Sequence, residues 1–418
     1  MDLQQQIETI GHNARSASWS IASLSPDIKN KTLLSISSRI DKERAEIKQA
    51  NSLDMEAGKK AGLSGAMLDR LLLSDKRIDA MIDSLRQVAL LEDPVGEIFD
   101  MHTRPNGLRV GRMRTPIGVI GIIYESRPNV TADAASLCLK SGNAVILRGG
   151  KEAIHSNRKI VELMQKGARD VGFPEHVVQL IPVVDREAVA ILLKMNKYID
   201  LIIPRGGKSL IETVVQNSTI PVIKHYDGNC YIYVDADADI ESAVSIIINS
   251  KTQRPGVCNA VESLLLHKDI AQTLMAKLVP AFQEKKVEFR ADSTVRSWYP
   301  ELKEATEEDW FTEYLDLILT VGVVDSVEQA ISFINTYGSH HTDAILTCNY
   351  ENAHRFLNNV DSACVFVNCS TRFSDGGEFG MGCEIGISTD KLHARGPMGL
   401  KELTSAKFIV LGNGQIRE

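Results

Sequence analysis

The sequence predicts an α/β protein built from more than one domain. Its 418 residues are more than a single hydrophobic core of ordinary size holds, so two or three domains are expected. From Pro116 to about Asp239, short apolar strands alternate with helical stretches, which is typical of a parallel, doubly wound sheet. A second α/β region follows from about Glu241 to Asp361. The strands expected in the first sheet are 119–123, 144–147, 177–181, 201–203 and 231–234.

The N-terminal part of the chain, up to about residue 92, is predicted to be helical. Ser25 precedes Pro26, and a serine cap followed by proline in the first turn is a common helix start. Ser74 and Asp75 give a second start, and apolar residues follow it at helical spacing. We therefore expect at least two amphipathic helices before the first sheet.

Between Glu97 and Met113 the pattern changes from helix to hairpin. Asn106-Gly107 is favoured in tight turns, and apolar residues flank it. A hairpin alone is only marginally stable in water, so this one should pack on another domain or subunit. After Phe373 the chain is rich in glycine, and residues 407–411 are predicted to form a last strand.

The composition argues against several classes of protein. The formal net charge is −7, which disfavours a general nucleic-acid surface. The N-terminus lacks the basic start and apolar core of a signal peptide, and no apolar run reaches the roughly 18 to 20 residues of a membrane span. The seven cysteines include no C-x-x-C spacing, so neither a disulfide framework nor a metal site is expected. A reducing cytoplasm fits this use of cysteine best.

Cys258 is the candidate nucleophile. It lies between two apolar runs, 243–248 and 261–266, just after a polar Arg-Pro-Gly break that should present it on a loop. Positive charge on Lys251 and Arg254 can lower the pKa of a nearby thiol and favour the reactive thiolate. The alternative is a buried cysteine that packs as a small hydrophobic residue.

Two glycine pairs, in 148–151 and 205–208, each follow a predicted strand and precede a predicted helix. Such turns can bind an anion because free N–H groups and the helix dipole point at it, and the neighbouring Arg and Lys favour a cofactor with phosphates. The alternative is a plain strand-to-helix turn. Neither a Walker loop nor a G-x-G-x-x-G fingerprint is present, which disfavours a standard Rossmann dehydrogenase. The residues assigned to the cofactor are Arg148, Gly149, Gly150, Lys151, Gly206 and Gly207.

The segment 124–131 follows the first strand, where open α/β sheets bind ligands. Asn129 could donate a hydrogen bond to a developing oxyanion, although turns and helix caps also use asparagine. Arg127 and Lys140 are candidates for pairing with a substrate carboxylate or phosphate. His341 lies in a polar stretch and is predicted to be a surface residue rather than a catalytic one.

Several motifs, spread over nearly the whole chain, occur together in one known family. The motifs are Tyr124-Glu-Ser-Arg-Pro-Asn129, Arg148-Gly-Gly-Lys-Glu-Ala153, Ile203–Gly207, Lys251–Ala260, Phe379–Ser388 and His393–Leu400. In kind and in order they resemble the gamma-glutamyl phosphate reductase family, also called glutamate-5-semialdehyde dehydrogenase, of the aldehyde dehydrogenase superfamily.

The resemblance implies an aldehyde-dehydrogenase-like fold of two doubly wound α/β domains plus an oligomerisation element, made from the hairpin and the C-terminal strand. It thereby implies a homo-oligomer, either a dimer or a tetramer. The implied parts are an NADPH-binding domain (1–96 and 116–239), a catalytic cysteine domain (240–375), the oligomerisation element (97–115 and 400–418) and a glycine-rich connecting segment (376–399).

The resemblance also implies an activity: NADPH-dependent reduction of L-glutamyl 5-phosphate to L-glutamate 5-semialdehyde, with phosphate release, in proline biosynthesis. Cys258 would form a thioester, and Asn129 would assist at the oxyanion. Glu313 matches the superfamily glutamate that holds the nicotinamide ribose. A glutamate 5-kinase is a candidate partner, because it would supply the acyl phosphate. The basic residues assigned to the substrate are Arg127, Lys140 and Arg254.

Two alternatives remain at this point. A hydrolytic semialdehyde dehydrogenase needs a glutamate that activates the deacylating water, and the corresponding stretch, 222–229, contains none. A reductase that releases phosphate needs no such water. The second alternative is a catalytically silent, dehydrogenase-like binding protein, which the presence of Cys258, Glu313 and both glycine pairs disfavours.

Overall fold

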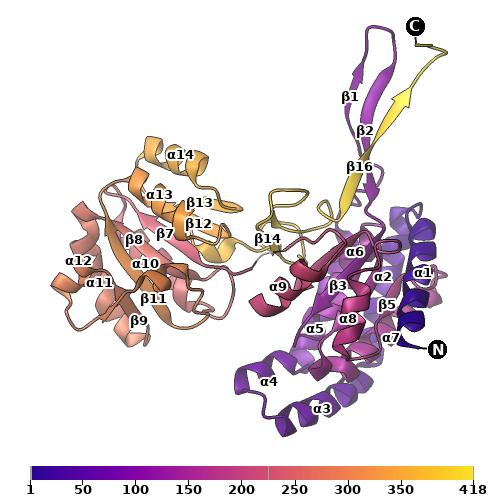
Figure 1. Cartoon of the computed structure of the whole chain (residues 1–418), viewed down its shortest axis with the longest axis horizontal. Coiled ribbons are helices and arrows are strands. Elements are labelled where there is room, and N and C mark those ends of the chain that lie inside the picture. Colours follow the sequence, from indigo (N-terminus) through magenta and orange to yellow (C-terminus); the bar gives the residue numbers. More distant parts are fainter. Residues whose placement is uncertain (1, 225, 418) are drawn as a thin grey trace. The chain divides into compact units, whose positions relative to one another are not determined.

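The computed structural model of the chain describes residues 2–224 and 226–417. It divides into two compact units, which are described one at a time (Figure 1). Unit 1 comprises residues 2–224, 380–386 and 398–417, and unit 2 comprises residues 226–379 and 387–397. Each unit contains a parallel sheet with helices between its strands, which confirms the predicted α/β class.

Helices form the first part of unit 1, as predicted. The Ser25 side chain accepts a hydrogen bond from the backbone N–H of Ile28, and Pro26 occupies the first turn. Ser74 caps its helix in the same way, by accepting from the N–H of Arg77. Across residues 2–224 and 226–417, no helix is long and apolar enough to cross a membrane. These first helices are α1 (Leu3–Ile21), α2 (Pro26–Lys42), α3 (Arg44–Lys60), α4 (Gly65–Leu71) and α5 (Asp75–Leu90).

The sheet of unit 1 is parallel and has the order β5-β4-β3-β6. Its interior strand β3 is wholly buried, as an unbroken apolar run requires. The strand order reverses between β3 and β6, and open α/β sheets bind ligands outside the carboxyl ends of the strands at such a point. The strands are β3 (Val119–Tyr124), β4 (Ala144–Gly149), β5 (Val178–Leu180) and β6 (Leu201–Arg205), and the helices are α6 (Val130–Lys140), α7 (Ile154–Asp170), α8 (Arg186–Leu192) and α9 (Lys208–Asn217), with the short η1 (Lys151–Ala153) before α7.

One predicted strand of this sheet lies elsewhere. The strand expected at 231–234 is β7 (Cys230–Val234), and it belongs to the sheet of unit 2, where it pairs with β8 and β12. The boundary between the units therefore falls at residue 224, earlier than the expected 239. A fully buried strand has the same apolar pattern in either sheet, so the pattern alone could not assign it.

The sheet of unit 2 has seven parallel strands in the order β10-β9-β11-β8-β7-β12-β13 (Figure 1). β8 is the fourth of the seven strands, and it pairs with β11 on one side and, after a register shift between Cys230 and Tyr231, with β7 on the other. The other strands are β8 (Val261–His267), β9 (Glu288–Ala291), β10 (Lys303–Glu304), β11 (Ile318–Val324), β12 (Thr342–Leu346) and β13 (Cys364–Val367). The helices are α10 (Ile240–Thr252), α11 (Lys268–Glu284), α12 (Ser293–Trp298), α13 (Val327–Tyr337), α14 (Tyr350–Asn359), η2 (Glu307–Phe311) and η3 (Thr371–Phe373).

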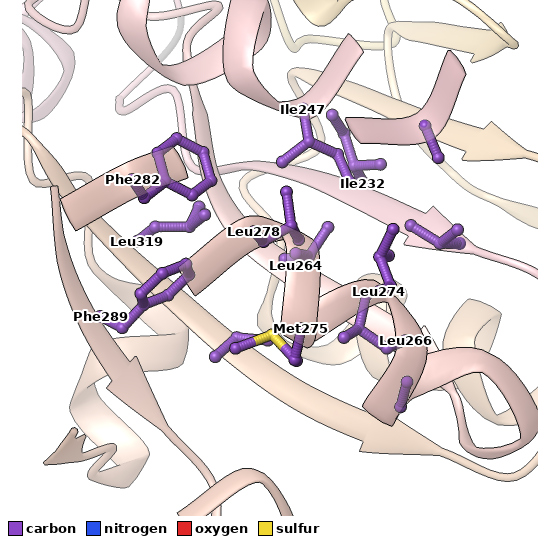
Figure 2. Close-up of a cluster of buried hydrophobic side chains, with 14 of the residues drawn as sticks. Ile232, Ile247, Leu264, Leu266, Leu274, Met275, Leu278, Phe282, Phe289 and Leu319 are labelled. Atoms are coloured by element: carbon purple, nitrogen blue, oxygen red, sulfur yellow. The ribbon is translucent and has the colours of Figure 1, made fainter. Parts of the chain in front are cut away.

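A large apolar core lies between this sheet and helices α10 and α11 (Figure 2). Ile247 of α10 and Leu264 and Leu266 of β8 are fully buried in it. Burying a side chain of this size contributes roughly 1.5–3 kcal/mol. The core therefore fixes α10 and β8, which are the two elements that flank the Cys258 loop.

A separate antiparallel sheet completes unit 1. The predicted hairpin is confirmed, because β1 (Ile98–Thr103) pairs with β2 (Arg109–Pro116), and Gly107 takes a left-handed φ of +86° in the turn. The predicted last strand is β16 (Thr404–Leu411), which pairs along the whole of β2. The expected glycine-rich connection, 376–399, is shared between the units and contains β14 (Ile387–Ser388) and β15 (Gly396–Pro397).

Asp343 places a carboxyl group where β12 pairs with β7. It is fully buried, and one of its oxygens accepts the backbone N–H of Tyr231 at 2.7 Å. The other oxygen accepts from the Ser362 hydroxyl. Burial raises the pKa of Asp343 from its ordinary 3.8 to about 7, and the two hydrogen bonds offset this only in part.

This raised pKa predicts a stability that depends on pH. Folded Asp343 keeps its proton up to about pH 7, whereas the unfolded chain releases it near 3.8. The free energy of unfolding should therefore fall as the pH rises from about 4 to about 7. The isosteric variant Asp343→Asn should remove that part of the slope in urea titrations across this range. Equal slopes in both proteins would contradict the prediction.

Candidate active site

Cys258 lies in the loop between the end of α10 and the start of β8, as predicted, and it is half-buried. The backbone of Gly228 packs closely against the backbone of this loop at Cys258. A Cβ atom at position 228 would lie 2.0 Å from the carbonyl oxygen of Cys258 and 2.6 Å from its Cα. No side chain fits there, so glycine at position 228 lets the two backbones pack directly on one another.

Lys251 and Glu262 form an ion pair between the two elements that precede and follow this loop. Lys251 is in the last turn of α10, Glu262 is near the start of β8, and both side chains are 0% exposed. The Lys251 Nζ donates to Glu262 at 2.5 Å. Burial lowers the pKa of Lys251 and raises that of Glu262, while each partner's charge opposes the shift. The ammonium that we expected beside the thiol is thus bound to a carboxylate.

A polar network lies beneath Cys258. The Cys230 thiol donates to the carbonyl of Cys258 at 3.2 Å, and its sulfur lies 3.7 Å from Nδ1 of His341. His341 is fully buried, so the prediction of a surface histidine is wrong. It directly precedes β12, an interior strand of the sheet, and a polar sequence context does not reveal such a position. The Nδ1 of His341 is also 2.9 Å from the hydroxyl oxygen of Thr342.

Glu313 is half-buried in the segment before β11, and the two residues that follow it are fixed. The Tyr314 hydroxyl donates to Asp309 at 2.8 Å. The backbone N–H of Leu315 donates to the second oxygen of Glu262 at 3.2 Å. Leu315 has a left-handed φ of +54°, a conformation that non-glycine residues adopt only when their surroundings hold them. Glu262 therefore contacts both the base of the Cys258 loop and the Glu313 segment.

Arg254 and Arg372 bring positive charge to the same loop. Arg254 is exposed beside Gln253, whose side-chain oxygen accepts from Nε of Arg372 at 2.9 Å. Burial lowers the pKa of Arg372, and the nearby Arg254 charge lowers it further, whereas the negative charge of a Cys258 thiolate raises it. Arg372 was not predicted as a site residue, because it lies far along the chain in η3 and no local pattern marks it.

Three of these segments in unit 2 lie just before strands of one parallel sheet. Cys258 precedes β8, the Glu313 segment precedes β11 and His341 precedes β12. Since parallel strands all begin at the same edge, the candidate residues gather at the amino-terminal edge of the sheet. This arrangement differs from the carboxyl-edge location that we used to interpret the first sheet.

In unit 1, the glycine-pair turns follow β4 and β6, as predicted. A Cβ atom at Gly149 would lie 2.0 Å from the Asn157 amide nitrogen, and a Cβ at Gly207 would meet nothing within 4 Å. The N–H of Gly207 donates to the Glu125 carboxylate at 3.0 Å. At the Gly149-Gly150 turn the carboxylate is that of Glu152. A Cβ atom at Gly150 would lie 2.2 Å from one of its oxygens. Carboxylates of the chain thus lie at both turns.

The basic residues of these turns differ in their surroundings. Arg148 donates to the carbonyl of Val184 at 2.9 Å, and burial lowers its pKa. Lys151 is exposed beside the Gly149-Gly150 turn. A Cβ at position 206 would lie 2.5 Å from a Glu125 oxygen, so the Glu125 side chain would have to move to admit one.

The structure contradicts the assignment of Lys140 to the substrate. Lys140 is 1% exposed, and its ammonium donates to Asn30 and to the carbonyl of Ala89 at 3.0 Å. It ends α6, whereas Asn129 lies at the start of that helix, roughly 15 Å away along the axis. The sequence showed a lysine after an apolar helix but not that other helices cover it.

Asn129 and Arg127 lie after β3, at the edge where we expected them. The Asn129 amide donates to Asp133 at 2.9 Å, one turn further along α6. Burial raises the pKa of Asp133. Arg127 is half-buried in the same loop.

Known proteins are similar to this chain over most or all of its length. The model of the aldehyde dehydrogenase family matches residues 2–297. A curated gamma-glutamyl phosphate reductase of Geotalea daltonii is 56% identical, with 100% of both chains covered. The chain belongs to the gamma-glutamyl phosphate reductase family of aldehyde dehydrogenases.

A solved gamma-glutamyl phosphate reductase, that of Thermotoga maritima, has a TM-score of 0.96 and 46% identity and covers 99% of this chain and 100% of its own. An engineered glycolyl-CoA reductase with bound NADP⁺ is 17% identical and shares the fold, with a TM-score of 0.70 over 97% of this chain and 96% of its own. The predicted family and fold are therefore confirmed. Aldehyde dehydrogenases use nicotinamide cofactors.

The close contact between Gly228 and Cys258 predicts that adding one methyl group at position 228 strongly lowers the reactivity of the Cys258 thiol. Gly228→Ala should displace the Cys258 loop and lower the rate of thiol alkylation by iodoacetamide about tenfold or more, since small displacements strongly affect reactivity. The matched control is Gly256→Ala in the same loop, where a Cβ would lie 3.8 Å from the nearest atom, the carbonyl oxygen of Leu315. The control should alkylate at the wild-type rate. Equal rates in all three proteins would show that Gly228 does not fix the loop.

Proposed function

We propose that this chain catalyses the NADPH-dependent reduction of L-glutamyl 5-phosphate to L-glutamate 5-semialdehyde, with phosphate release, in proline biosynthesis. The observation that carries the proposal is a half-buried Cys258 on a fixed loop, in a chain that matches gamma-glutamyl phosphate reductases over its full length. The missing glutamate in 222–229 supports a reductase over a hydrolytic enzyme.

In the proposed mechanism, the thiolate of Cys258 attacks the acyl carbon of the substrate. The tetrahedral oxyanion accepts hydrogen bonds from backbone N–H groups near Cys258, with Asn129 as a further donor. The C–O bond to phosphate then breaks, and a thioester remains on Cys258. When bound, NADPH supplies the hydride that reduces the thioester carbon. The resulting alkoxide re-forms a carbonyl, the C–S bond breaks, and the aldehyde leaves with the thiolate regenerated.

We assign the cofactor to the two glycine-pair turns and to Glu313. The N–H of Gly207 already binds an anion, the Glu125 carboxylate, which fits a site for a nucleotide phosphate. Gly206 and Gly149-Gly150 belong to the same turns, and exposed Lys151 is the candidate for a 2′-phosphate. Arg148 fits this role less directly, since it donates to the Val184 carbonyl. Glu313 is the proposed acceptor for the nicotinamide ribose.

We assign the substrate's negative charges to arginines. Arg254 and Arg372 lie beside the Cys258 loop and are the proposed site for the departing phosphate. Arg127 is the remaining candidate for a substrate carboxylate.

We further propose that the sheet of β1, β2 and β16 mediates homo-oligomerisation. Its apolar residues are unusually exposed for a soluble protein, with Phe408 70% exposed, Val410 56% and Ile98 54%. A dimer or a tetramer would bury them. A glutamate 5-kinase is the proposed source of the labile acyl phosphate.

The proposed mechanism predicts that the reverse reaction requires phosphate. With NADP⁺ and glutamate 5-semialdehyde, NADPH should form only when inorganic phosphate is present to release the acyl group from Cys258. Formation without phosphate would show that water releases it, and the hydrolytic function would replace this one. Cys258→Ala should abolish turnover, whereas Cys348→Ala, which removes an exposed thiol, should not.

The assignment of Arg372 to the phosphate site predicts that its removal weakens the binding of phosphate but not of NADP⁺. Arg372→Gln should raise KM for phosphate in the reverse reaction about tenfold or more, because a hydrogen bond to a charged group contributes roughly 1.5–3 kcal/mol. KM for NADP⁺ should stay unchanged. The control Arg355→Gln, which breaks an exposed ion pair with Glu328, should alter neither constant. An unchanged phosphate KM in Arg372→Gln would remove Arg372 from the phosphate site.

A further inference from the structure

The buried ion pair of Lys251 and Glu262 has no role in the mechanism above. Its two residues stand on either side of the Cys258 loop, at the end of α10 and the start of β8. Both side chains are 0% exposed. The pair thus ties together the two points from which the nucleophile loop departs.

Stability does not explain such a pair. Moving two charges out of water costs free energy that their attraction often fails to recover, and apolar residues of similar volume are frequently at least as stable. The surrounding core already fixes α10 and β8 through Ile247 and Leu264 (Figure 2). A buried ion pair is better suited to fixing one geometry, because its hydrogen bonds are directional.

Glu262 has a second contact that apolar residues could not replace. Its other oxygen accepts the N–H of Leu315, two positions after Glu313. The left-handed backbone of Leu315 needs such a partner to persist. One carboxylate therefore holds both the nucleophile loop and the segment that carries Glu313.

Tyr314, which lies between Glu313 and Leu315, is anchored independently. The Tyr314 hydroxyl contacts Asp309 at 2.8 Å and the Thr320 hydroxyl at 2.7 Å. Asp309 is itself bound by Arg290. Tyr314 is thereby tied to β11, so the carboxylate of Glu262 sets how the Glu313 segment meets the Cys258 loop.

We propose that the Lys251–Glu262 pair is a positioning element that sets the thiol of Cys258 relative to Glu313. The Lys251 charge favours the ionised form of Glu262 against the effect of burial, and the Glu262 carboxyl group accepts from both the ammonium and the Leu315 N–H. The two residues touch neither substrate nor cofactor in this scheme. The inference rests on the proposed function, because Glu313 matters to the reaction only if it holds the nicotinamide ribose.

The decisive variant replaces the pair by apolar residues, Lys251→Met with Glu262→Leu, in the full chain. This double variant should stay folded and melt near the wild-type temperature, because the free energy recovered by removing the buried charges offsets the lost hydrogen bond of Leu315. Its kcat in the phosphate-dependent reverse reaction should nevertheless fall roughly 100-fold, as expected for a misplaced reacting group, and KM for NADP⁺ should rise. A stable double variant with wild-type kcat and KM would overturn the proposal.

A second variant covers the case in which the double variant does not fold. Glu262→Gln keeps the size and one acceptor for Leu315 but places an amide against the Lys251 ammonium. It should lower kcat and the rate of Cys258 alkylation by iodoacetamide, each about tenfold or more. Wild-type values for both would equally overturn the proposal.

The matched control is the buried pair Lys29–Asp93 of unit 1, with side chains 0% and 3% exposed. Lys29→Met with Asp93→Leu should leave Cys258 alkylation unchanged. Alkylation also separates the two hypotheses, because it needs neither substrate nor cofactor. If the wild-type protein reduced no glutamyl phosphate, the proposed function would fail, and the alkylation rates would still decide whether the pair positions the thiol.

Discussion

The central position of β8 in the seven-stranded sheet is the constraint on which the candidate site depends. Strands on both sides hold β8 in register, and the apolar core fixes it against α10 and α11 (Figure 2). The loop that carries Cys258 is therefore attached to the most constrained part of unit 2. Because all seven strands are parallel, the segments before β8, β11 and β12 begin at the same edge. The parallel sheet, rather than any one local motif, brings these segments together.

Much of the fold could be predicted because its signals are local. The caps at Ser25 and Ser74, the Asn106-Gly107 turn and the alternation of strands and helices all depend on neighbouring residues. The placement of β7 could not be predicted, because a buried strand has the same pattern in either sheet. The position of Cys258 on a loop could likewise be predicted from the Arg-Pro-Gly break that precedes it. The burial of Lys140 and His341 was not, since each depends on elements distant in sequence that cover it. Arg372 was missed for the same reason.

The glycine-pair turns show how an anion site can be filled from within the chain. The helix N-terminus at Gly207 meets the Glu125 carboxylate, and Glu152 accepts from the N–H and hydroxyl of Ser126. These contacts satisfy backbone donors that would otherwise face solvent. Under the proposed cofactor assignment, a nucleotide phosphate would compete with Glu125 for the same N–H, so its affinity would depend on Glu125 as well as on the basic residues. Counting arginines and lysines in the sequence does not reveal this competition.

The pairing of β16 with β2 has a consequence for how the protein is made. Arg114 and Thr404 contact each other although 290 positions separate them in the chain. During synthesis, one edge of β2 therefore stays unpaired until the residues of β16 have left the ribosome. Sheet edges in this state are prone to pair with other chains. Arg109, Arg112 and Arg114 lie within β2, and their like charges should disfavour pairing of β2 with the same strand of a second nascent chain until β16 arrives.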